Sequence, residues 1–350
     1  MFPLSLPLTA FFAASALSSP LGNGGPTSRD QAQSQTCSFI HGPFLAPNFP
    51  DPSLLKVGNT YYSFATHPGK DVQMAKSTDF SSKWDRVSEP QILEIDQAPW
   101  AGKAKSGSYE IWAPDVGQQQ HGSKKYIMYF AALDKENTEN HCIGAATSSS
   151  ITGPYTPSTT PLDCDRKQAG VMDPAFFRDP GTKKTYLVYK TEIPAEYNSL
   201  SIRELSSADD GSEGLEWPDR SAATQLVKVN SPAGFSDGNN IEDPFLFKHK
   251  DTYFLLFSTH FTGDGTYNVE YAHSSTVDGD YTRVKDPLFS TGMMGCDNII
   301  GPGGASFVVD GDSVRVIFHS LTAEKTISKR VAYTATVKVD GNTLSVDTSG

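Results

Sequence analysis

One phrase recurs along the chain at nearly constant spacing. A polar turn with a proline leads into two or three apolar residues, and a second turn then leads into an aromatic-rich apolar run. The prolines of the four clear copies, Pro52, Pro114, Pro174 and Pro244, lie 62, 60 and 70 residues apart, and Gly304 opens a degenerate fifth copy 60 residues further on. Self-similarity at this period indicates a fold built from repeated units. Function is therefore expected where the repeats converge.

Each unit carries the pattern of four short strands. The apolar runs are rich in Tyr, Phe, Val and Ile and are separated by turn residues such as Gly, Asn, Asp and Pro. Apolar spacing of three and four never persists for ten residues, so long helices are not expected. The pattern predicts an all-β, five-bladed β-propeller, in which the proline phrase opens the strand nearest the axis. A two-sheet sandwich would not explain so regular a period.

Composition and charge limit the kinds of partner. The 350 residues are 37% hydrophobic and 20% charged, which is ample for a large core and argues against disorder. The formal net charge of −11 disfavours nucleic acid and anionic membranes, because binding phosphate needs clustered Lys and Arg. No segment after the N-terminal one is apolar for the eighteen or so residues that a membrane span needs.

The N-terminal region is typical of an exported protein. Residues 1–19 are uncharged and apolar and resemble a secretory signal peptide, although they have no basic n-region, and residues 20–36 form a polar linker. A buried N-terminal segment is the alternative. We expect a secreted, extracellular protein whose residues 37–350 form the propeller domain.

Four cysteines lie downstream of that segment, and an even count in a secreted chain suggests disulfides. Cys142 and Cys164 flank one connection and are our first choice for a pair, which leaves Cys37 to reach Cys296. Three pairings are open to four cysteines, so this one is a hypothesis. None of the four has the spacing of a zinc ligand.

Carboxylates precede the prolines of three repeats. Asp51, Asp173 and either Glu242 or Asp243 occupy equivalent places, and any one of them alone would more often only shape a turn. The second repeat has Ala113 there, so the turn itself does not require an acid. Acids that converge on one cavity repel one another, and chains keep such repulsion mainly where chemistry uses it. Without phosphate loops or metal spacing, the pattern favours glycosidic bond cleavage.

The fourth repeat leaves a choice between two acids. Asp243 matches the register of Asp51 and Asp173. Because adjacent residues on a strand face opposite ways, we expect only one of Glu242 and Asp243 to point inward.

The chain resembles glycoside hydrolase family 43, five-bladed propeller enzymes that act on arabinose- and xylose-containing polysaccharides. The resemblance runs from about Phe49 to Ser345 and covers all five blades. Each motif is weak alone, but five in order at blade spacing are specific. The motifs are Pro50-Asp51-Pro52-Ser53, Trp112-Ala113-Pro114-Asp115-Val116, Met172-Asp173-Pro174-Ala175, Ile241-Glu242-Asp243-Pro244, and Gly301-Pro302-Gly303-Gly304 with Phe318-His319-Ser320.

The resemblance implies a role for each acid. Asp51 would be the general base, Asp173 the residue that orients the sugar and modulates the acid's pKa, and Glu242 the general acid, since the family's acid lies two positions before proline. A small residue is frequent in the family where Asp243 stands. Family members invert configuration, which implies a base and an acid roughly 6.5–9.5 Å apart, a raised pKa for Glu242 and an ionised Asp51.

The expected substrate is an α-L-arabinofuranosyl linkage in plant cell-wall arabinan or arabinoxylan, with a β-xylosidase as the alternative. Trp112 neighbours the second repeat start and is expected to offer a face to the sugar, although strand aromatics more often pack between blades. Trp100, Phe49 and His260 are weaker candidates of the same kind.

No cofactor is expected to be required for the chemistry. The resemblance implies that His319 contacts a structural calcium or sodium ion, or its waters, in the central channel. A lone histidine on an apolar strand is more often a core residue. We expect a monomer with a carbohydrate partner, and neither nucleic acid nor membrane.

Two rival functions remain to be compared. The fructoside-cleaving propellers share an Arg-Asp-Pro motif, but here Arg178-Asp179-Pro180 lies in a turn beyond the third-blade strand and their other signatures are missing. A non-catalytic carbohydrate-binding propeller would lose at least one of the three acids. All three are present, which favours an enzyme.

Overall fold

The computed structural model describes residues 37–349 apart from 68, 70, 89–90, 121–124, 168, 193–197, 207–213, 219–222 and 312. The predicted signal peptide at residues 1–19 and the linker at 20–36 lie outside the described residues. In the described part of the chain, no helix is long and apolar enough to cross a membrane.

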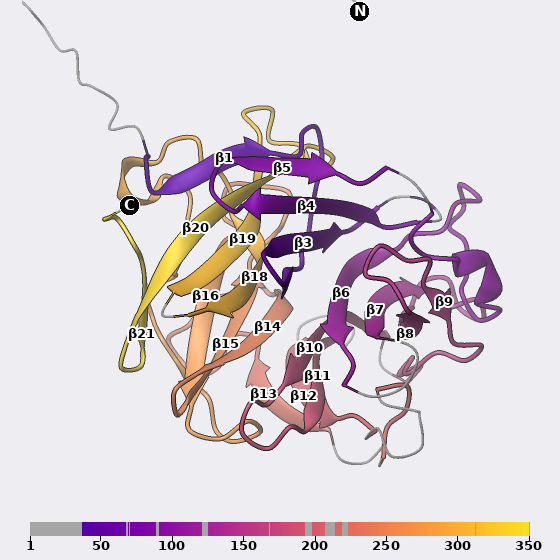
Figure 1. Cartoon of the computed structure of the whole chain (residues 1–350). Helices are drawn as coiled ribbons and strands as arrows, with labels where there is room; N and C mark the ends of the chain where they lie inside the picture. Colours follow the sequence, from indigo (N-terminus) through magenta and orange to yellow (C-terminus); the bar gives the residue numbers. More distant parts are fainter. Residues whose placement is uncertain are drawn as a thin grey trace, which may run out of the picture. The chain divides into compact units, whose positions relative to one another are not determined.

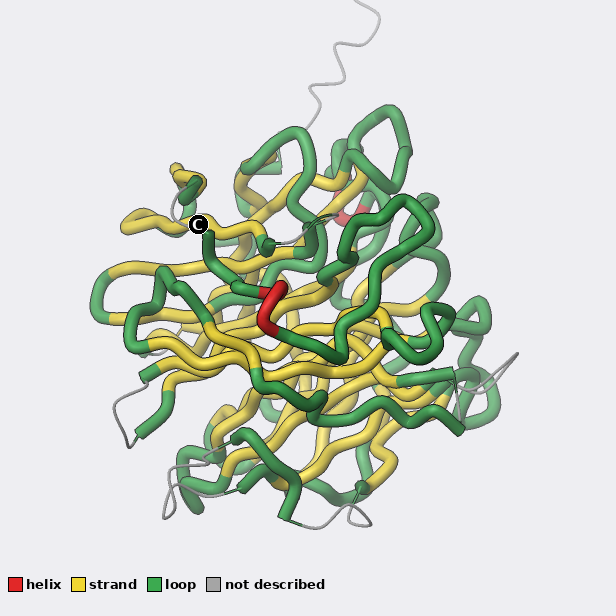
Figure 2. The backbone as a smooth tube through the Cα atoms, turned by 90° about the vertical axis from the view of Figure 1, so that its right-hand side faces the viewer, coloured by secondary structure: helices red, strands yellow, loops and turns green. Residues whose placement is uncertain are grey.

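Five antiparallel sheets follow one another along the chain (Figure 1), and Figure 2 shows helix only as short turns. The five sheets confirm the predicted five-bladed propeller. Blade one contains β2 (Leu55–Val57), β3 (Thr60–Ala65), β4 (Gln73–Asp79) and β5 (Lys83–Arg86), and blade two contains β6 (Trp112–Gln118), β7 (Tyr126–Leu133), β8 (His141–Ser148) and β9 (Thr156–Pro157). Blade three contains β10 (Val171–Arg178), β11 (Thr185–Thr191), β12 (Ser199–Glu204) and β13 (Thr224–Lys228). Blade four contains β14 (Ile241–His249), β15 (Thr252–Thr259), β16 (Asn268–Ser274) and β17 (Thr282–Arg283).

The fifth blade is completed by the beginning of the described chain. Its strands are β18 (Gly303–Asp310), β19 (Ser313–Leu321), β20 (Arg330–Asp340), β21 (Thr343–Val346) and β1 (Ile40–Phe44). Strand β1 pairs with one half of the outer edge of β20, and β21 pairs with the other half. Figure 1 shows the indigo β1 beside the yellow β20. The ring is therefore closed by hydrogen bonds between the two ends of the domain, which removes a free strand edge.

Two disulfides are present, and they confirm the predicted pairing. Cys37, three residues before β1, is bonded to Cys296, which directly follows the short helix η3 (Met293–Gly295). Cys142 on β8 is bonded to Cys164. The first bond fixes the N-terminal closing strand to the loop that leads into blade five.

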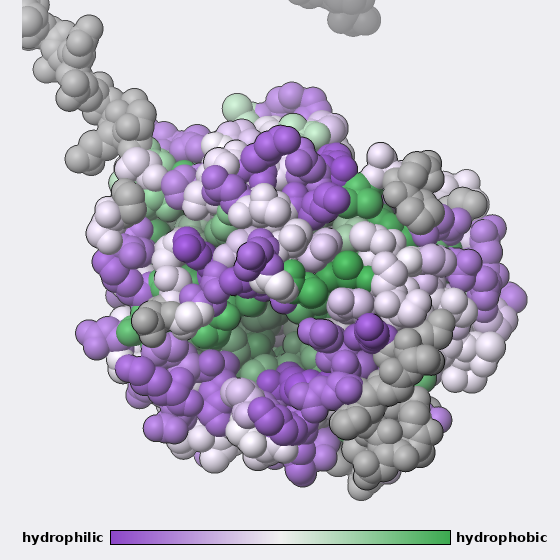
Figure 3. Space-filling view, in the orientation of Figure 1, coloured by the Kyte–Doolittle hydropathy of each residue, from purple (hydrophilic) through white to green (hydrophobic). Residues whose placement is uncertain are grey.

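The core lies between neighbouring blades, so each sheet is covered on both faces. All eight residues of β7 are buried, which explains why the aromatic runs are continuously apolar rather than alternating. Between blades four and five, the ring of Phe247 lies 5.2 Å from that of Phe254 and 5.5 Å from that of Phe307, centroid to centroid. Burying one such side chain contributes roughly 1.5–3 kcal/mol. Figure 3 shows one face hollowed near its centre, with hydrophobic residues inside the hollow and hydrophilic residues around it.

The inner strands of blades two to five share a β-bulge at the proline phrase. In β10, Met172 pairs with Lys190 but Ala175 pairs with Val188, so Asp173 and Pro174 together oppose one residue. Strands β6, β14 and β18 shift register at the equivalent place. The equivalent residue of every blade has a left-handed backbone, with φ values of 51° at Asp51, 41° at Ala113, 52° at Asp173, 48° at Asp243 and 56° at Gly304. The repeat seen in the sequence is thus a repeated backbone turn.

The two disulfides are expected to stabilise the fold unequally. A loop-entropy estimate gives about 5.5 kcal/mol for the 259-residue separation of Cys37 and Cys296 and about 3.5 kcal/mol for the 22-residue separation of Cys142 and Cys164. Replacing the first pair by alanine should therefore lower the free energy of unfolding by about 2 kcal/mol more than replacing the second. Denaturant unfolding of the two double variants measures this, and equal losses would contradict the closing role of the first bond.

Candidate active site

The five proline phrases meet at the centre of the ring. A narrow cavity of about 40 Å³ is lined by three successive residues from each blade, beginning with Asp51, Ala113, Asp173, Asp243 and Gly304. A larger pocket of about 390 Å³ shares Asp51, Asp173 and Asp243 with this cavity and adds Glu242. The structure thus brings together the three acids that the sequence singled out, although they are far apart in the chain.

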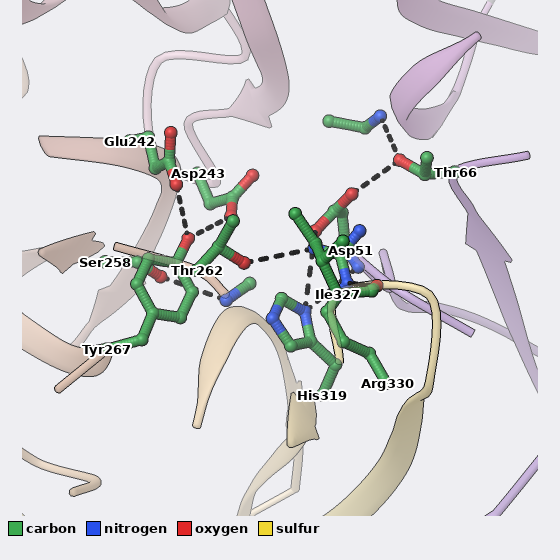
Figure 4. A network of polar contacts seen from close by, with 12 residues as sticks. Asp51, Thr66, Glu242, Asp243, Ser258, Thr262, Tyr267, His319, Ile327 and Arg330 are labelled. Atoms are coloured by element: carbon green, nitrogen blue, oxygen red, sulfur yellow. Dashed lines mark hydrogen bonds and ion pairs between the residues drawn. The ribbon is translucent and has the colours of Figure 1, made fainter. Parts of the chain in front are cut away.

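Asp51 is fixed by hydrogen bonds from three sides (Figure 4). Its Oδ2 accepts a hydrogen bond from Thr66 Oγ1 at 2.6 Å, and its Oδ1 accepts one from Arg330 Nη1 at 2.9 Å. Its backbone N–H donates to His319 Nδ1 at 3.1 Å. Arg330 begins β20 and also donates to Thr262 Oγ1 at 3.1 Å. The carboxylate therefore has a fixed orientation toward the pocket.

Asp173 is buried on β10 beside the other acids. Its Oδ2 accepts the backbone N–H of Asp243 at 3.2 Å, which joins the inner strands of blades three and four. Burial raises the pKa of Asp173 to about 7, with the charges of Glu242 and Asp51 adding to the rise and Lys190 opposing it.

Glu242 faces a lysine that the sequence analysis missed. Its Oε2 lies 3.0 Å from Lys190 Nζ, and its Oε1 accepts a contact from Tyr267 Oη at 2.9 Å. Burial alone would raise the pKa of Glu242, but the charge of Lys190 and the hydrogen bonds from Asn240, Lys190 and Tyr267 together outweigh it and lower that pKa below its usual value. The expectation of a raised pKa for Glu242 is therefore corrected: the adjacent ammonium favours the carboxylate.

Lys190 lies at the inner end of β11, with only 3% of its side chain exposed. Its ammonium also contacts Asn240 Oδ1 at 3.2 Å and Glu192 Oε1 at 3.1 Å. Burial would lower the pKa of Lys190, but the charges of Glu242, Asp173 and Glu192 together raise it. The one signal in the sequence was a lysine directly after the apolar run that ends at Tyr189.

Glu242 and Asp243 both line the pocket, contrary to the expectation that only one could point inward. Glu242 pairs with Ser258, whereas the next pairing is Phe245 with Leu256, so Asp243 is the bulged residue. A bulge interrupts the alternation of side chains, and the left-handed backbone of Asp243 turns its carboxyl toward the same side. The alternation rule failed because it assumed a regular strand.

Of the four predicted sugar-contacting residues, one lines the pocket. Trp112 is half-buried in its wall, and its ring lies 4.3 Å from that of His141. Phe49 has no exposed surface and packs in the core between blades one and five. Trp100 is 8% exposed, stacks on Phe130 and donates its indole N–H to a carbonyl.

His260 is partly buried and is not among the residues that line the pocket. Its ring packs against Gly238 and its Nδ1 contacts Thr259 Oγ1 at 2.9 Å. The predictions for Phe49 and Trp100 are thus corrected, because both side chains are packed in the core, while that for His260 stays a prediction.

His319 does not fit direct ligation of a cation. It is fully buried, and burial, aided by Arg330, lowers the pKa of His319 well below its usual value. In the resulting neutral ring Nδ1 accepts the N–H of Asp51, so the proton lies on Nε2 and no lone pair remains for a metal. Among the described residues, the ligand-like cluster is Asp134 with Cys142 and Cys164, whose sulfurs form a disulfide. A contact of His319 with a cation's waters stays a prediction.

Comparisons with known proteins agree with this arrangement. The model of the glycosyl hydrolases family 43 matches residues 40–338. The chain belongs to this family. An extracellular endo-α-(1→5)-L-arabinanase of Thermotoga petrophila is 29% identical over 74% of the chain, and a putative β-xylosidase of Escherichia coli is 26% identical over 72%. The chain spans about half the length of these relatives, 55% and 43% respectively.

Solved structures of family 43 share the propeller. The crystal structure of a thermostable family-43 glycoside hydrolase has a TM-score of 0.71 with 23% identity, covering 85% of this chain and 92% of that one. This likeness shows a shared fold. The five-bladed architecture predicted from the repeats is therefore that of the family.

The raised pKa of Asp173 predicts a pH-dependent stability. A carboxyl whose pKa is higher in the folded than in the unfolded chain binds more protons when folded, so the free energy of unfolding falls as pH rises from about 4 to about 7. Asp173→Asn removes this loss and should gain stability relative to the wild type by on the order of a few kcal/mol at pH 8, and little at pH 4. Denaturant unfolding at the two pH values measures the difference.

Asp179 is the matched control because its pKa is lowered in the folded protein, whereas that of Asp173 is raised. Burial would raise the pKa of Asp179, but hydrogen bonds from Tyr253 and from the amides of Thr182 and Gly181 lower it to about 2. The stability it contributes is present above pH 4 and is lost as pH falls toward 2. Asp179→Asn should therefore be less stable than the wild type at neutral pH. Parallel curves for Asp173→Asn and the wild type would contradict the assignment for Asp173.

Proposed function

We propose that this protein is a secreted glycosidase that cleaves α-L-arabinofuranosyl linkages of plant cell-wall arabinan or arabinoxylan with inversion of configuration. The observation that carries the proposal is that Asp51, Asp173 and Glu242, from three different blades, line one pocket. Membership of family 43 supports the class of reaction. The arabinanase relative supports arabinose as the sugar and an extracellular site of action, and the two disulfides agree with secretion.

The pocket offers separate groups for the two proton transfers of an inverting hydrolysis. Asp51, oriented by Arg330 and Thr66, takes a proton from a water as that water's oxygen bonds to the anomeric carbon. Glu242 gives its proton to the glycosidic oxygen as the bond between this oxygen and the anomeric carbon breaks. Asp173 lies on the blade next to that of Glu242, where its charge influences the proton affinity of Glu242.

Trp112 supplies an apolar face in the same pocket, which suits packing against the face of a sugar ring that presents C–H groups. We expect the chain to act as a monomer, with no cofactor in the chemical step. The xylosidase relative makes a β-xyloside the alternative substrate. Digestion of linear arabinan, arabinoxylan and an aryl β-xyloside side by side distinguishes the two sugars, and preferred cleavage of the xyloside would replace arabinose by xylose in the proposal.

The role of Glu242 predicts a loss that depends on the leaving group. With an aryl arabinofuranoside of poor leaving ability, Glu242→Gln should lower kcat by about 10²–10⁴, because general acid catalysis contributes about this much. With a dinitrophenyl leaving group, which departs without a proton, the loss should be far smaller. Glu136→Gln, an exposed residue of blade two, is the control and should leave both rates unchanged. Equal losses on both substrates would eliminate Glu242 as the acid.

Inversion is tested by the first product formed. Proton NMR recorded during the early minutes of hydrolysis should show β-L-arabinofuranose appearing before mutarotation, because water attacks from the face opposite the leaving group. Asp51→Asn should abolish turnover on every leaving group, since the water loses its base. Initial release of the α-anomer would contradict the assignment of Asp51 as a base.

A further inference from the structure

The hydroxyl of Tyr267 lies between two carboxyl groups (Figure 4). Its Oη is 2.9 Å from Glu242 Oε1 and 2.7 Å from Asp243 Oδ2. Burial raises the pKa of Tyr267 well above its usual value, so the hydroxyl keeps its proton. One hydroxyl has one proton and can donate to only one of the two oxygens. The other contact is a hydrogen bond only if its carboxyl brings a proton, so one of these two acids is neutral.

The surroundings identify Asp243 as the neutral acid. Lys190 lies 3.0 Å from Glu242, whereas no described Lys, Arg or His is within ion-pair distance of the Asp243 carboxyl. Burial, together with the charges of Asp173, Asp51 and Glu242, raises the pKa of Asp243 well above its usual value. The charged or titratable groups around this part of the pocket are Asp51 before β2, Asp173 on β10, Lys190 on β11, Glu242 on β14, Tyr267 before β16, His319 on β19 and Arg330 on β20.

The position of Tyr267 depends on a glycine in blade five. Gly303 occupies the place in β18 that Glu242 occupies in β14, one residue before the bulge. A Cβ on Gly303 would lie 1.8 Å from a ring carbon of Tyr267, so the missing side chain makes the space that the tyrosine fills. The ring of Tyr267 also stacks on His319, with 5.8 Å between centroids.

Asp243 occupies a backbone position that glycine would adopt without strain. Its φ is 48°, a conformation that costs a non-glycine residue about 1–2 kcal/mol. A strained carboxyl placed among three other acids is therefore a feature of this chain that the roles of Asp51, Asp173 and Glu242 do not explain.

We propose that Asp243 and Tyr267 form a proton relay that delivers a proton to Glu242 in each turnover, when substrate occupies the pocket, an inference that rests on the function proposed above. Asp243 Oδ2–H passes its proton to Tyr267 Oη as the tyrosine passes its own proton to Glu242 Oε1. Asp243 is left as a carboxylate and regains a proton from solvent, since it lines both the pocket and the central cavity. The net change is one proton moved from Asp243 to Glu242, with no change of oxidation state.

The relay explains how Glu242 can act as an acid although its surroundings favour its ionised form. A general acid must hold a proton when substrate arrives, but Lys190 favours the carboxylate of Glu242. Asp243 holds that proton two hydrogen bonds away from Glu242, where no described cation stabilises the carboxylate form. Asp243 thus acts through Glu242 and does not need to touch the sugar.

Asp243→Asn and Tyr267→Phe each test the relay. Asn keeps the size of the side chain but has no proton to transfer, and Phe keeps the ring but removes the hydroxyl. On a poor leaving group each variant should lower kcat by about 10- to 100-fold, and the alkaline limb of the pH profile should move to lower pH. On a dinitrophenyl leaving group the loss should stay below about threefold, because that step needs no proton.

The matched control is Asp115→Asn, the same substitution at a buried acid of blade two that lines the central cavity but not the pocket. It should leave both rates unchanged. If Asp243→Asn loses the same factor on both leaving groups, the residue acts through packing and the relay is wrong. Unchanged rates on both would also overturn it.

A spectroscopic measurement separates this inference from the proposed function. Infrared spectra of protein labelled with ¹³C at aspartate carboxyls should show a protonated carboxyl band at pH 8 that is missing in Asp243→Asn. At that pH Asp173 and Asp115, whose pKa values are raised to about 7 and about 6, are mostly ionised. No such band would overturn the relay. A band in a protein that cleaves no arabinoside or xyloside would instead overturn the proposed function and leave the protonated Asp243 standing.

Discussion

The bulge that interrupts the inner strands of blades two to five is the constraint on which the site depends. In a regular strand Glu242 and Asp243 would face opposite sides, and the acids of three blades could not share one pocket. The left-handed residue of the bulge turns the chain so that both face inward. Four non-glycine residues adopt this conformation, each at about 1–2 kcal/mol, and the packing between blades offsets that cost.

The bulges bring four carboxyl groups close together, and two cationic side chains each contact one of them. Arg330 contacts Asp51 and Lys190 contacts Glu242, while Asp173 and Asp243 have raised pKa values. Asp173, Glu242 and Asp243 therefore have different proton affinities although they lie around one pocket. This difference allows one carboxylate to accept a proton and another group to supply one in the same reaction.

Much of this architecture could be predicted from the sequence, because each blade has its own copy of a short, recognisable sequence pattern. The proline phrases identify the blades and the acids, and cysteine spacing suggested the disulfide pairs that the structure confirms. The closing strand β1 could not be predicted, since it precedes the first repeat and pairs with a strand almost three hundred residues away.

The residues that tune the acids were also beyond the sequence analysis. Lys190 comes from a second strand, Tyr267 from a loop and Arg330 from the last blade, and none of them belongs to the repeated phrase. Their contacts arise only when neighbouring blades are packed. Phe49 and Trp100 were misassigned for the related reason that an aromatic near a motif can equally face the core.

The most direct measurement is a crystal structure of Glu242→Gln with an arabino-oligosaccharide. The account predicts a sugar in the pocket beside Trp112, its glycosidic oxygen about 3 Å from the side chain of residue 242, and a water between the anomeric carbon and Asp51. A sugar bound elsewhere, such as in the apolar pocket lined by Phe176, Phe245 and Phe307, with the acids untouched, would contradict it.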